Sequence, residues 1–228
     1  MKPRVAILIS GRGSNMAALI AAAALPDYPA QMALVVADRA DAAGLALAAQ
    51  AGLATATIPS QGRPREAFEA ELQALLAKHR TDFIALAGFM RVLTPAFVQA
   101  WEGRMVNIHP SLLPSFPGLH THARALAAGV RLHGCTVHLV STGVDEGPIL
   151  AQAAVPVLEG DTEEALAARV LVQEHLLYAA ALAWLVAGHA WMEEGRLVVA
   201  APAATGALAN PLPEIPGLPT HAPDAGKV

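Results

Sequence analysis

The stretch RVAILISGRGSN, residues 4–15, decides how the chain is expected to fold. Its first six residues form an apolar run with β-branched side chains, which is typical of a strand buried on both faces of a parallel sheet. A glycine-containing turn follows, and an alanine-rich segment then predicts a helix over residues 16–25, ending before Pro26. A strand, a turn and a helix in this order indicate the first unit of a doubly wound α/β sheet.

The same alternation continues to about residue 200. Apolar runs predict strands over residues 32–37, 54–58, 82–87, 105–108, 136–140, 149–157 and, more weakly, 196–200. Helices are expected over residues 41–51 with Asp41 as the N-cap, 65–79, from Thr94 onward, 121–128, and from an Asp161 or Thr162 cap to about residue 187. We therefore predict an α/β fold with a doubly wound, mainly parallel sheet in a single domain. The strands at 136–140 and 149–157 should pair as a hairpin, and the proline-rich residues 201–228 should form a disordered tail.

The composition argues against several classes of protein. The 228 residues are 54% hydrophobic and 15% charged, which is a globular composition. A formal net charge of -4 gives no basic footprint for nucleic acid or an anionic membrane. The longest apolar run, residues 176–188, is shorter than the roughly 20 residues that a membrane-spanning helix needs, so a buried helix is expected. The single cysteine, Cys135, excludes an internal disulfide and fits a reducing compartment such as the cytoplasm.

The turn at residues 10–15, SGRGSN, is a candidate phosphate site. Its glycines let backbone N–H groups approach an anion, and the following helix N-terminus favours negative charge. The turn is only half of the dinucleotide fingerprint, because Met16 occupies the position of the third glycine. Asp38 ends the next strand, where an NAD enzyme would hold a ribose. The pattern therefore favours a single phosphate over NAD, with an ordinary strand–helix turn as the alternative.

Residues 107–145 carry the candidate chemistry. Asn107 and His109 are two positions apart on an expected strand, so their side chains point the same way. An amide can donate hydrogen bonds to an oxyanion, and an imidazole can carry a proton near neutral pH. Asp145 lies in the loop after a later strand, which is also expected at the carboxyl edge of the sheet, and it could orient that imidazole and stabilise its charged form. These three residues are a candidate set for proton transfer at a carbonyl, although a purely structural role for His109 is an equal alternative.

Other residues are less informative. Five histidines lie close in sequence, at positions 109, 120, 122, 133 and 138, but their spacing does not match a metal site, and no metal is expected. His133 and His138 are interpreted as strand or loop residues with local hydrogen bonds. The segment GFMRVL at residues 88–93 could wall a flat ring or belong to the core. On their own, Glu174 and Arg65 have the character of solvated helix residues.

Several of these motifs together resemble the phosphoribosylglycinamide formyltransferase family, folate-dependent enzymes of purine synthesis. The resemblance covers about residues 4–185 and includes ISGRGSN, LAGFMRVL, HGCTVHLV, VDEGPIL and VQEH. Its most specific part is NIHPSLLPSFPGLHTH, residues 107–122. The SLLP core is shared with methionyl-tRNA formyltransferase and formyltetrahydrofolate hydrolase, whereas SGRGSN and PGLHTH are typical of the purine enzyme. Arg12 and Cys135 depart slightly from the family pattern.

The resemblance implies a Rossmann-like formyltransferase domain over residues 1–200. Its first half, residues 1–100, would bind the phosphate and nucleotide, and residues 101–200 would carry catalysis and the folate. The catalytic set would be Asn107, His109 and Asp145. The ribonucleotide would be bound by Gly13, Ser14, Asn15, Leu171, Val172, Gln173 and Glu174. The folate would be bound by Arg65, Met90, Arg91, Val92, Leu93, Asn107, Ser141, Thr142, Gly143, Val144 and Asp145.

The implied reaction transfers the formyl group of 10-formyltetrahydrofolate, as co-substrate, to the amine of 5'-phosphoribosylglycinamide through a tetrahedral intermediate. This reaction needs no metal, nucleic acid or membrane. A homodimer is compatible with the resemblance. The alternatives are formyltetrahydrofolate hydrolase or another folate-dependent formyltransferase, an NAD-dependent oxidoreductase, a zinc hydrolase, and a nucleotide-sensing module without catalysis.

Overall fold

The computed structural model describes residues 1–200 and contains one seven-stranded sheet in the order β3-β2-β1-β4-β5-β6-β7. The strands of the sheet are β1 (Arg4–Ile9), β2 (Gln31–Ala37), β3 (Thr55–Thr57), β4 (Phe83–Leu86), β5 (Met105–His109), β6 (Leu132–Leu139) and β7 (Ile149–Pro156). The helices are α1 (Ser14–Ala23), α2 (Gly44–Gln50), α3 (Arg65–Lys78), α4 (Pro95–Ala100), α5 (Thr121–Ala127) and α6 (Glu163–Val186). A separate hairpin pairs β8 (Ala190–Glu193) with β9 (Arg196–Val199).

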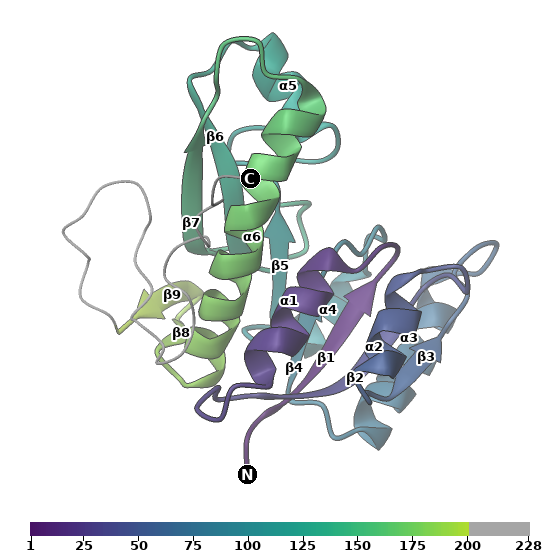
Figure 1. Cartoon of the computed structure of the whole chain (residues 1–228). Helices are drawn as coiled ribbons and strands as arrows, with labels where there is room; N and C mark the ends of the chain where they lie inside the picture. Colours follow the sequence, from purple (N-terminus) through teal and green to yellow (C-terminus); the bar gives the residue numbers. More distant parts are fainter. Residues whose placement is uncertain (201–228) are drawn as a thin grey trace.

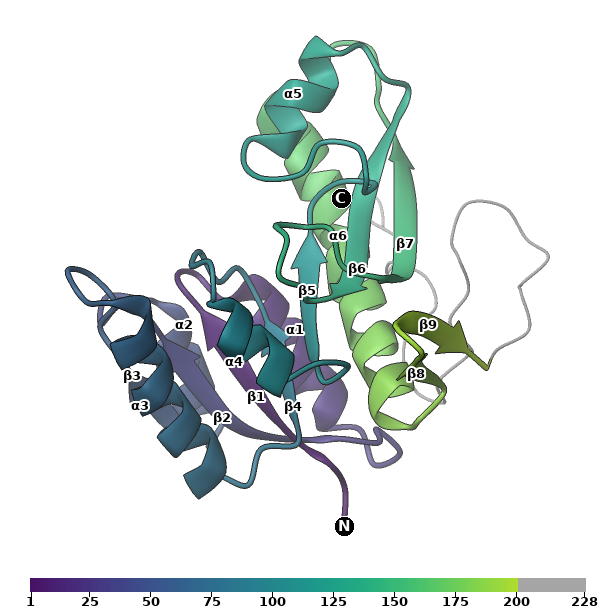
Figure 2. The same ribbon diagram turned by 180° about the vertical axis from the view of Figure 1, so that it is seen from behind.

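The sheet is covered on both faces, as the continuous apolar runs predicted. Helices α1 and α6 lie on one face (Figure 1), and α3 and α4 lie on the other (Figure 2). Strand β1 is at the centre, and from Val5 to Ile9 its side chains are fully buried. The core therefore has two parts, one between the sheet and α1 with α6, the other between the sheet and α3 with α4. The predicted α/β fold with a mainly parallel sheet in a single domain is confirmed.

Strands β1 to β5 pair in parallel, whereas β6 runs antiparallel to β5 and to β7. The predicted hairpin is therefore present, and it extends away from the rest of the sheet alongside α6 (Figure 1). Strand β6 begins at Leu132, four residues before the predicted start. The sequence prediction stopped short because His133 and Gly134 do not have a strong strand propensity. It also omitted β8, whose residues Ala190–Glu193 mix apolar and charged side chains.

The helix α6 begins after Thr162, whose side-chain oxygen accepts a hydrogen bond from the backbone N–H of Ala165. Asp161 does not cap it and instead pairs with Arg169. By length and composition alone α6 could cross a membrane, but half of its residues are buried, most of them between Leu177 and Val186, and the helix packs against the sheet and α1, as expected of a core helix. The apolar run at residues 176–188 is therefore part of the core, as predicted.

The predicted start of α2 was wrong. Helix α2 begins at Gly44 after Ala43 and has no side-chain cap, because the Asp41 carboxylate is bonded to the Arg39 guanidinium. Position 44 has no room for a side chain, which explains the glycine. Its backbone lies against Gly13, and an added Cβ would lie 2.6 Å from the Ile9 side chain. The predicted tail at residues 201–228 lies outside the described residues.

Candidate active site

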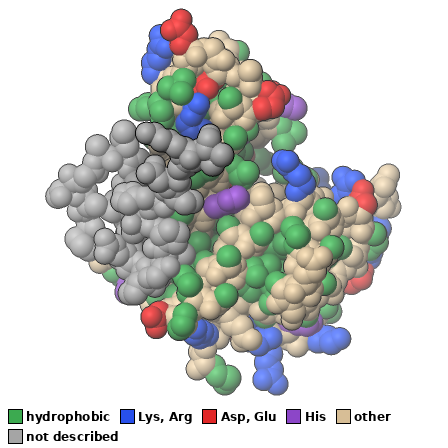
Figure 3. Space-filling view, viewed as in Figure 1, with side chains coloured by type: hydrophobic (Ala, Val, Ile, Leu, Met, Phe, Trp, Pro, Cys, Tyr) green, Lys and Arg blue, Asp and Glu red, His purple; other side chains and the backbone are tan. Residues whose placement is uncertain are grey.

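The candidate catalytic residues meet at the carboxyl end of β5. Strand β5 places Asn107 and His109 on one side of the sheet, since residues two apart on a strand share a face. The His109 side chain is almost completely buried. Figure 3 shows the surface hollowed between the part built from α5 and the top of α6 and the part that carries the ends of β1 and β2. The end of β5 lies at the base of the upper part (Figure 1).

Both ring nitrogens of His109 face hydrogen-bond acceptors. Nδ1 lies 3.3 Å from an oxygen of Asp145, and Nε2 lies 3.1 Å from the backbone carbonyl of Phe116. A neutral imidazole has only one N–H, so only the doubly protonated ring donates to both partners. The predicted association of His109 with Asp145 is therefore present, and the arrangement suits a positively charged imidazole.

Asp145 reaches His109 by a route that the sequence did not indicate. We expected its loop to leave the carboxyl edge of a parallel strand, but β6 is antiparallel, so the loop starts at the opposite edge and folds back. Asp145 adopts a left-handed backbone conformation with φ of 57°, and its carboxylate also accepts a hydrogen bond of 2.8 Å from the Gly118 N–H. That bond ties the loop after β6 to the proline-broken loop after β5.

His138 belongs to this cluster, although the sequence prediction gave it only local hydrogen bonds. Its Nε2 lies 3.2 Å from the amide nitrogen of Asn107 and 3.7 Å from Asp145. The signal that could have identified it is the strand register, because β6 places His138 directly opposite Asn107. That register follows only when β6 is known to be antiparallel.

The glycine turn meets α6, so that two segments far apart in the sequence form one site. The Asn15 amide nitrogen donates a hydrogen bond of 2.6 Å to the Glu174 carboxylate. Gly13 precedes α1 with φ of 76°, a conformation that favours glycine. Glu174 is buried, so the expectation of a solvated residue from its own sequence context was wrong. Burial raises the pKa of the Glu174 carboxyl above its ordinary value of 4.5, and the bond from Asn15 acts in the opposite direction.

Leu171, Val172 and Gln173 occupy the turn of α6 that precedes Glu174. Val172 is exposed, while Leu171 and Gln173 are half-buried. The side-chain oxygen of Asn15 is buried without a partner among the described residues. The structure therefore brings Glu174 to the start of α1 and leaves a hydrogen-bond acceptor there unused.

The segment from Met90 to Leu93 is held in place by its backbone and by Arg91. The Met90 N–H donates to the Ser10 hydroxyl at 2.9 Å, and the Arg91 guanidinium donates to the Ser60 carbonyl at 2.9 Å. The Met90 and Val92 side chains are exposed, whereas Leu93 is buried. Two exposed apolar side chains on an anchored segment form a surface that could cover a flat ring. Arg65, the first residue of α3, is also exposed.

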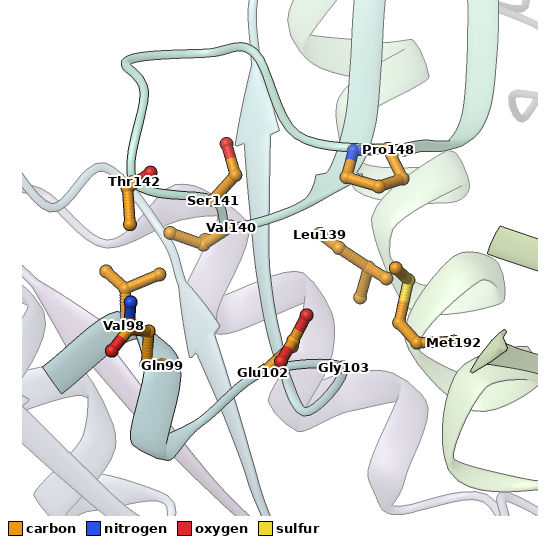
Figure 4. A pocket seen from close by; sticks show the side chains of 10 residues that line it. All are labelled: Val98, Gln99, Glu102, Gly103, Leu139, Val140, Ser141, Thr142, Pro148 and Met192. Carbon is orange, nitrogen blue, oxygen red and sulfur yellow. The ribbon is translucent and has the colours of Figure 1, made fainter. Parts of the chain in front are cut away.

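The loop that carries Asp145 also borders a groove of about 540 Å³ (Figure 4). Ser141 and Thr142 lie on one side of this groove, opposite Val98 and Gln99 from α4. Val144, next to Asp145, is another exposed apolar side chain. The groove does not include Asn107, His109 or Asp145, so it adjoins the catalytic cluster without containing it.

His122 and His133 form a separate pair. His122 Nδ1 and His133 Nε2 lie 3.2 Å apart, and burial lowers the pKa of His133 from its ordinary 6.5 to about 4. Within residues 1–200 there is no group of three or more histidine, cysteine, aspartate or glutamate side chains that could hold a metal ion. Asp38, the acid that an NAD enzyme would use, is buried and accepts a hydrogen bond from Ser60.

Comparison with known proteins gives a consistent result. The model of the formyl transferase family matches residues 3–182. Phosphoribosylglycinamide formyltransferase of Escherichia coli (strain K12) is 46% identical over 191 residues, which are 83% of this chain and 90% of that protein. The trifunctional purine biosynthetic protein adenosine-3 of Drosophila pseudoobscura pseudoobscura is 49% identical over 82% of this chain, but the chain spans only 14% of that protein.

Solved structures agree with these relatives. The crystal structure of phosphoribosylglycinamide formyltransferase from Brucella melitensis is 57% identical, with a TM-score of 0.79 over 82% of this chain and 97% of that one. A formyltetrahydrofolate deformylase from Pseudomonas syringae has a TM-score of 0.81 over 87% of this chain and 66% of its own, but only 26% identity. The fold is thus shared by transferring and hydrolysing enzymes, and identity is higher with the transferring ones.

Proposed function

The chain belongs to the formyl transferase family, and we propose that it transfers the formyl group of 10-formyltetrahydrofolate to the amine of 5'-phosphoribosylglycinamide in purine biosynthesis. The observation that carries this proposal is the cluster at the end of β5, where Asn107 and His109 lie on one face of the strand and His109 Nδ1 lies 3.3 Å from the Asp145 carboxylate. These groups can stabilise negative charge on a carbonyl oxygen and handle a proton. The relatives named above, with identities of 46% and 57%, support the choice of substrates.

In the reaction the substrate amine attacks the formyl carbon, and negative charge develops on the formyl oxygen. The Asn107 N–H and protonated His109 stabilise that oxygen, and Asp145 stabilises the charged His109. One such preorganised donor contributes about 3 kcal/mol to lowering the barrier in other enzymes. A proton is lost from the attacking nitrogen, and N10 of the folate gains one as the carbon–nitrogen bond breaks, through His109 or a water molecule.

The ribonucleotide binds where α1 meets α6. Its phosphate lies at Gly13, Ser14 and Asn15, where backbone N–H groups at the start of a ten-residue helix favour an anion. The Glu174 carboxylate, with Leu171, Val172 and Gln173 beside it, takes the ribose hydroxyls. The Asn15 amide nitrogen donates to the Glu174 carboxylate at 2.6 Å. This hydrogen bond connects the residue at the phosphate with the residue at the ribose.

The folate binds across β5 from the ribonucleotide. The segment Met90 to Leu93 supplies exposed apolar side chains and an anchored backbone, and the loop from Ser141 to Asp145 forms the other wall. Arg65, exposed at the start of α3, is available for a carboxylate of the folate. The two substrates then meet at Asn107 and His109. Holding two reactants in line contributes as much as about 7–11 kcal/mol in favourable cases.

The experiment is a folate-absorbance assay of the purified full chain, run with and without the ribonucleotide. We expect conversion of 10-formyltetrahydrofolate only when phosphoribosylglycinamide is present, with one formylated product for each folate consumed. Conversion with release of formate in the absence of the ribonucleotide would instead identify a formyltetrahydrofolate hydrolase. If neither mixture reacts, the proposed function is wrong. The purine pathway and the single cysteine, Cys135, also lead us to propose a cytoplasmic location.

A further inference from the structure

His138 and Asn107 are direct neighbours across two strands. In the antiparallel pair of β5 and β6, Asn107 is in register with His138. Side chains directly opposite each other in such a pair lie on the same face and touch. Here the Asn107 amide nitrogen lies 3.2 Å from His138 Nε2, and His138 is the only side-chain hydrogen-bond partner of Asn107 among residues 1–200.

The surroundings of the His138 ring decide which nitrogen carries its proton. Nδ1 lies 3.0 Å from the Leu139 carbonyl, which can only accept, so Nδ1 is protonated. Burial lowers the pKa of His138 below its ordinary value of 6.5, although the Leu139 carbonyl and Asp145 act in the opposite direction and His109 acts with burial. The neutral ring therefore presents a bare Nε2 to Asn107, and a bare nitrogen can only accept a hydrogen bond.

This fixes which way the Asn107 amide faces. An asparagine side chain can present either its carbonyl or its NH2 group to a neighbour after a half-turn. Only the NH2 group has a proton to give to Nε2, so the carbonyl orientation would leave two acceptors facing each other. One N–H of Asn107 is thus engaged by His138, and the second N–H on the same nitrogen has no partner among residues 1–200.

We propose that His138 is a positioning residue, whose Nε2 holds the Asn107 amide so that the remaining N–H faces the formyl oxygen during transfer. The inference rests on the proposed function, in which Asn107 donates to that oxygen. The ring is itself held in place, because the loop after β6 returns over it: a Cβ added at Gly147 would lie 3.3 Å from His138 Nδ1. His138 acts on the reaction only through Asn107.

The test compares two amide side chains at position 138. In His138→Gln the side-chain oxygen reaches the place of Nε2 and can accept from Asn107. In His138→Asn the amide reaches only the place of Nδ1, keeps the bond to Leu139 and leaves Asn107 free. We expect kcat to fall about 10- to 100-fold in His138→Asn, somewhat less than on loss of an oxyanion donor. KM for each substrate should stay within about threefold, and His138→Gln should recover most of kcat.

A double-mutant cycle checks that the effect passes through Asn107. In an Asn107→Ala background, His138→Asn should lower kcat no further. Equal kcat losses in His138→Gln and His138→Asn, no loss in His138→Asn, or a full further loss in the Asn107→Ala background would each overturn the inference. If wild type transfers no formyl group at all, it is the proposed function that fails.

A measurement on the wild type covers the case in which His138→Asn does not fold. Nitrogen-15 NMR of the full chain distinguishes the two tautomers of each histidine ring. We expect His138 to carry its proton on Nδ1, with Nε2 bare and coupled through the hydrogen bond to the Asn107 amide. A proton on Nε2 of His138 at neutral pH would overturn the inference.

Discussion

At the scale of single residues, the candidate site depends on a few buried polar side chains that are bonded to one another. His109 has an acceptor near each ring nitrogen, and Asp145, which lies 3.3 Å from His109 Nδ1, accepts a hydrogen bond from the Gly118 N–H. Removing one member of such a set leaves its partner without a hydrogen bond in a buried place, which is costly. Substitutions here should therefore affect both the reaction and the stability of the fold.

Replacing Asp145 by asparagine tests the charge on this residue. The side chain keeps its shape and its acceptor for Gly118, but it no longer stabilises a charged His109. We expect kcat to fall by at least about 100-fold, the size of effect seen when one charge-stabilising group is lost. Steady-state transfer rates measure this. Asp41→Asn, in an exposed pair with Arg39, is the control and should keep the wild-type rate. A near-normal rate for folded Asp145→Asn would contradict the assignment.

Replacing Glu174 by glutamine should raise stability while lowering activity. The raised pKa of this buried carboxyl means that the folded state prefers the protonated form. Wild-type stability therefore falls as pH rises from the ordinary value of 4.5 through the raised pKa, and the full cost is present above it. Glutamine removes that cost and still accepts from Asn15.

Urea unfolding at several pH values measures this effect. The stability gain of Glu174→Gln over wild type should be largest near pH 8 and shrink toward pH 5, while KM for the ribonucleotide rises. The exposed Glu159→Gln serves as the control and should change neither quantity appreciably. A Glu174→Gln variant that is less stable than wild type at pH 8 would show that the carboxylate is stabilised by its surroundings.

Single residues were predictable where local geometry decides their position. The pairing of Asn107 with His109 follows from two-residue spacing on a strand, and both lie on β5 as expected. The role of His138 was missed because its neighbour, Asn107, is 31 residues away and meets it only across two strands. Glu174 was misjudged for a similar reason, since Asn15 is 159 residues distant in sequence.

At the scale of secondary structure elements, α3 and α4 hold the segment that is proposed to bind the folate. The Thr94 hydroxyl accepts from the Phe97 N–H and so caps α4. The carboxylate of Glu69, on α3, accepts from both the N–H and the hydroxyl of Thr94. Arg91 lies over the Phe68 ring at 5.0 Å. The residues Met90 to Leu93 are therefore bounded by a cap at one end and by the Ser10 hydroxyl at the other.

Thr94→Ala should loosen this segment. We expect a loss of about 1 kcal/mol in unfolding free energy, which is typical for removal of a helix cap. KM for 10-formyltetrahydrofolate should rise, while KM for the ribonucleotide stays unchanged because its site lies at α1 and α6. Urea unfolding and substrate titrations measure the two effects. Thr162 caps α6 in the same way, so Thr162→Ala is the matched control. It should show a similar stability loss and an unchanged KM for the folate. A rise in both KM values for Thr94→Ala would argue against a folate-specific role.

The elements themselves were largely predictable, because apolar runs, helix caps and turns act locally. The exceptions have physical reasons. Asp41 was expected to cap α2, but its neighbour Arg39 competes for the carboxylate. The loop after β6 was placed at the wrong edge of the sheet, since an apolar run does not reveal in which direction its strand runs. The contact of Asp145 with His109 was nevertheless expected, from the chemistry of a histidine–carboxylate pair and from the family resemblance.

At the scale of the whole molecule, the proposed ribonucleotide site joins the beginning and the end of the described fold. Helix α1 follows the first strand and α6 is the last helix among residues 1–200, yet they pack side by side (Figure 1). The order of the seven strands could not be derived from the sequence, because it depends on which helices pack together. A ligand that bridges α1 and α6 should therefore stabilise the domain as one unit.

Adding the ribonucleotide should raise Tm. At a ligand concentration 100 times Kd, binding stabilises the folded state by about 2.7 kcal/mol, which corresponds to roughly 5–10 °C for a domain of this size. Differential scanning calorimetry measures the shift. Ser14→Ala should reduce it by weakening phosphate binding, and the control Asp41→Asn should keep it. If saturating ribonucleotide leaves Tm unchanged, the site at α1 and α6 is wrongly assigned.

The backbone carbonyl of Phe116 affects how His109 can donate a proton to a substrate. In the free protein, the Nε2 proton of His109 is already shared with a carbonyl oxygen of the same chain. In the proposed reaction, the formyl oxygen replaces the Phe116 carbonyl oxygen as the acceptor at Nε2 of His109. The ring therefore keeps an acceptor near each nitrogen throughout. The Phe116 carbonyl therefore competes with the substrate for the Nε2 proton of His109. The formyl oxygen holds this proton in preference to Phe116 only when it becomes more negative than an amide carbonyl.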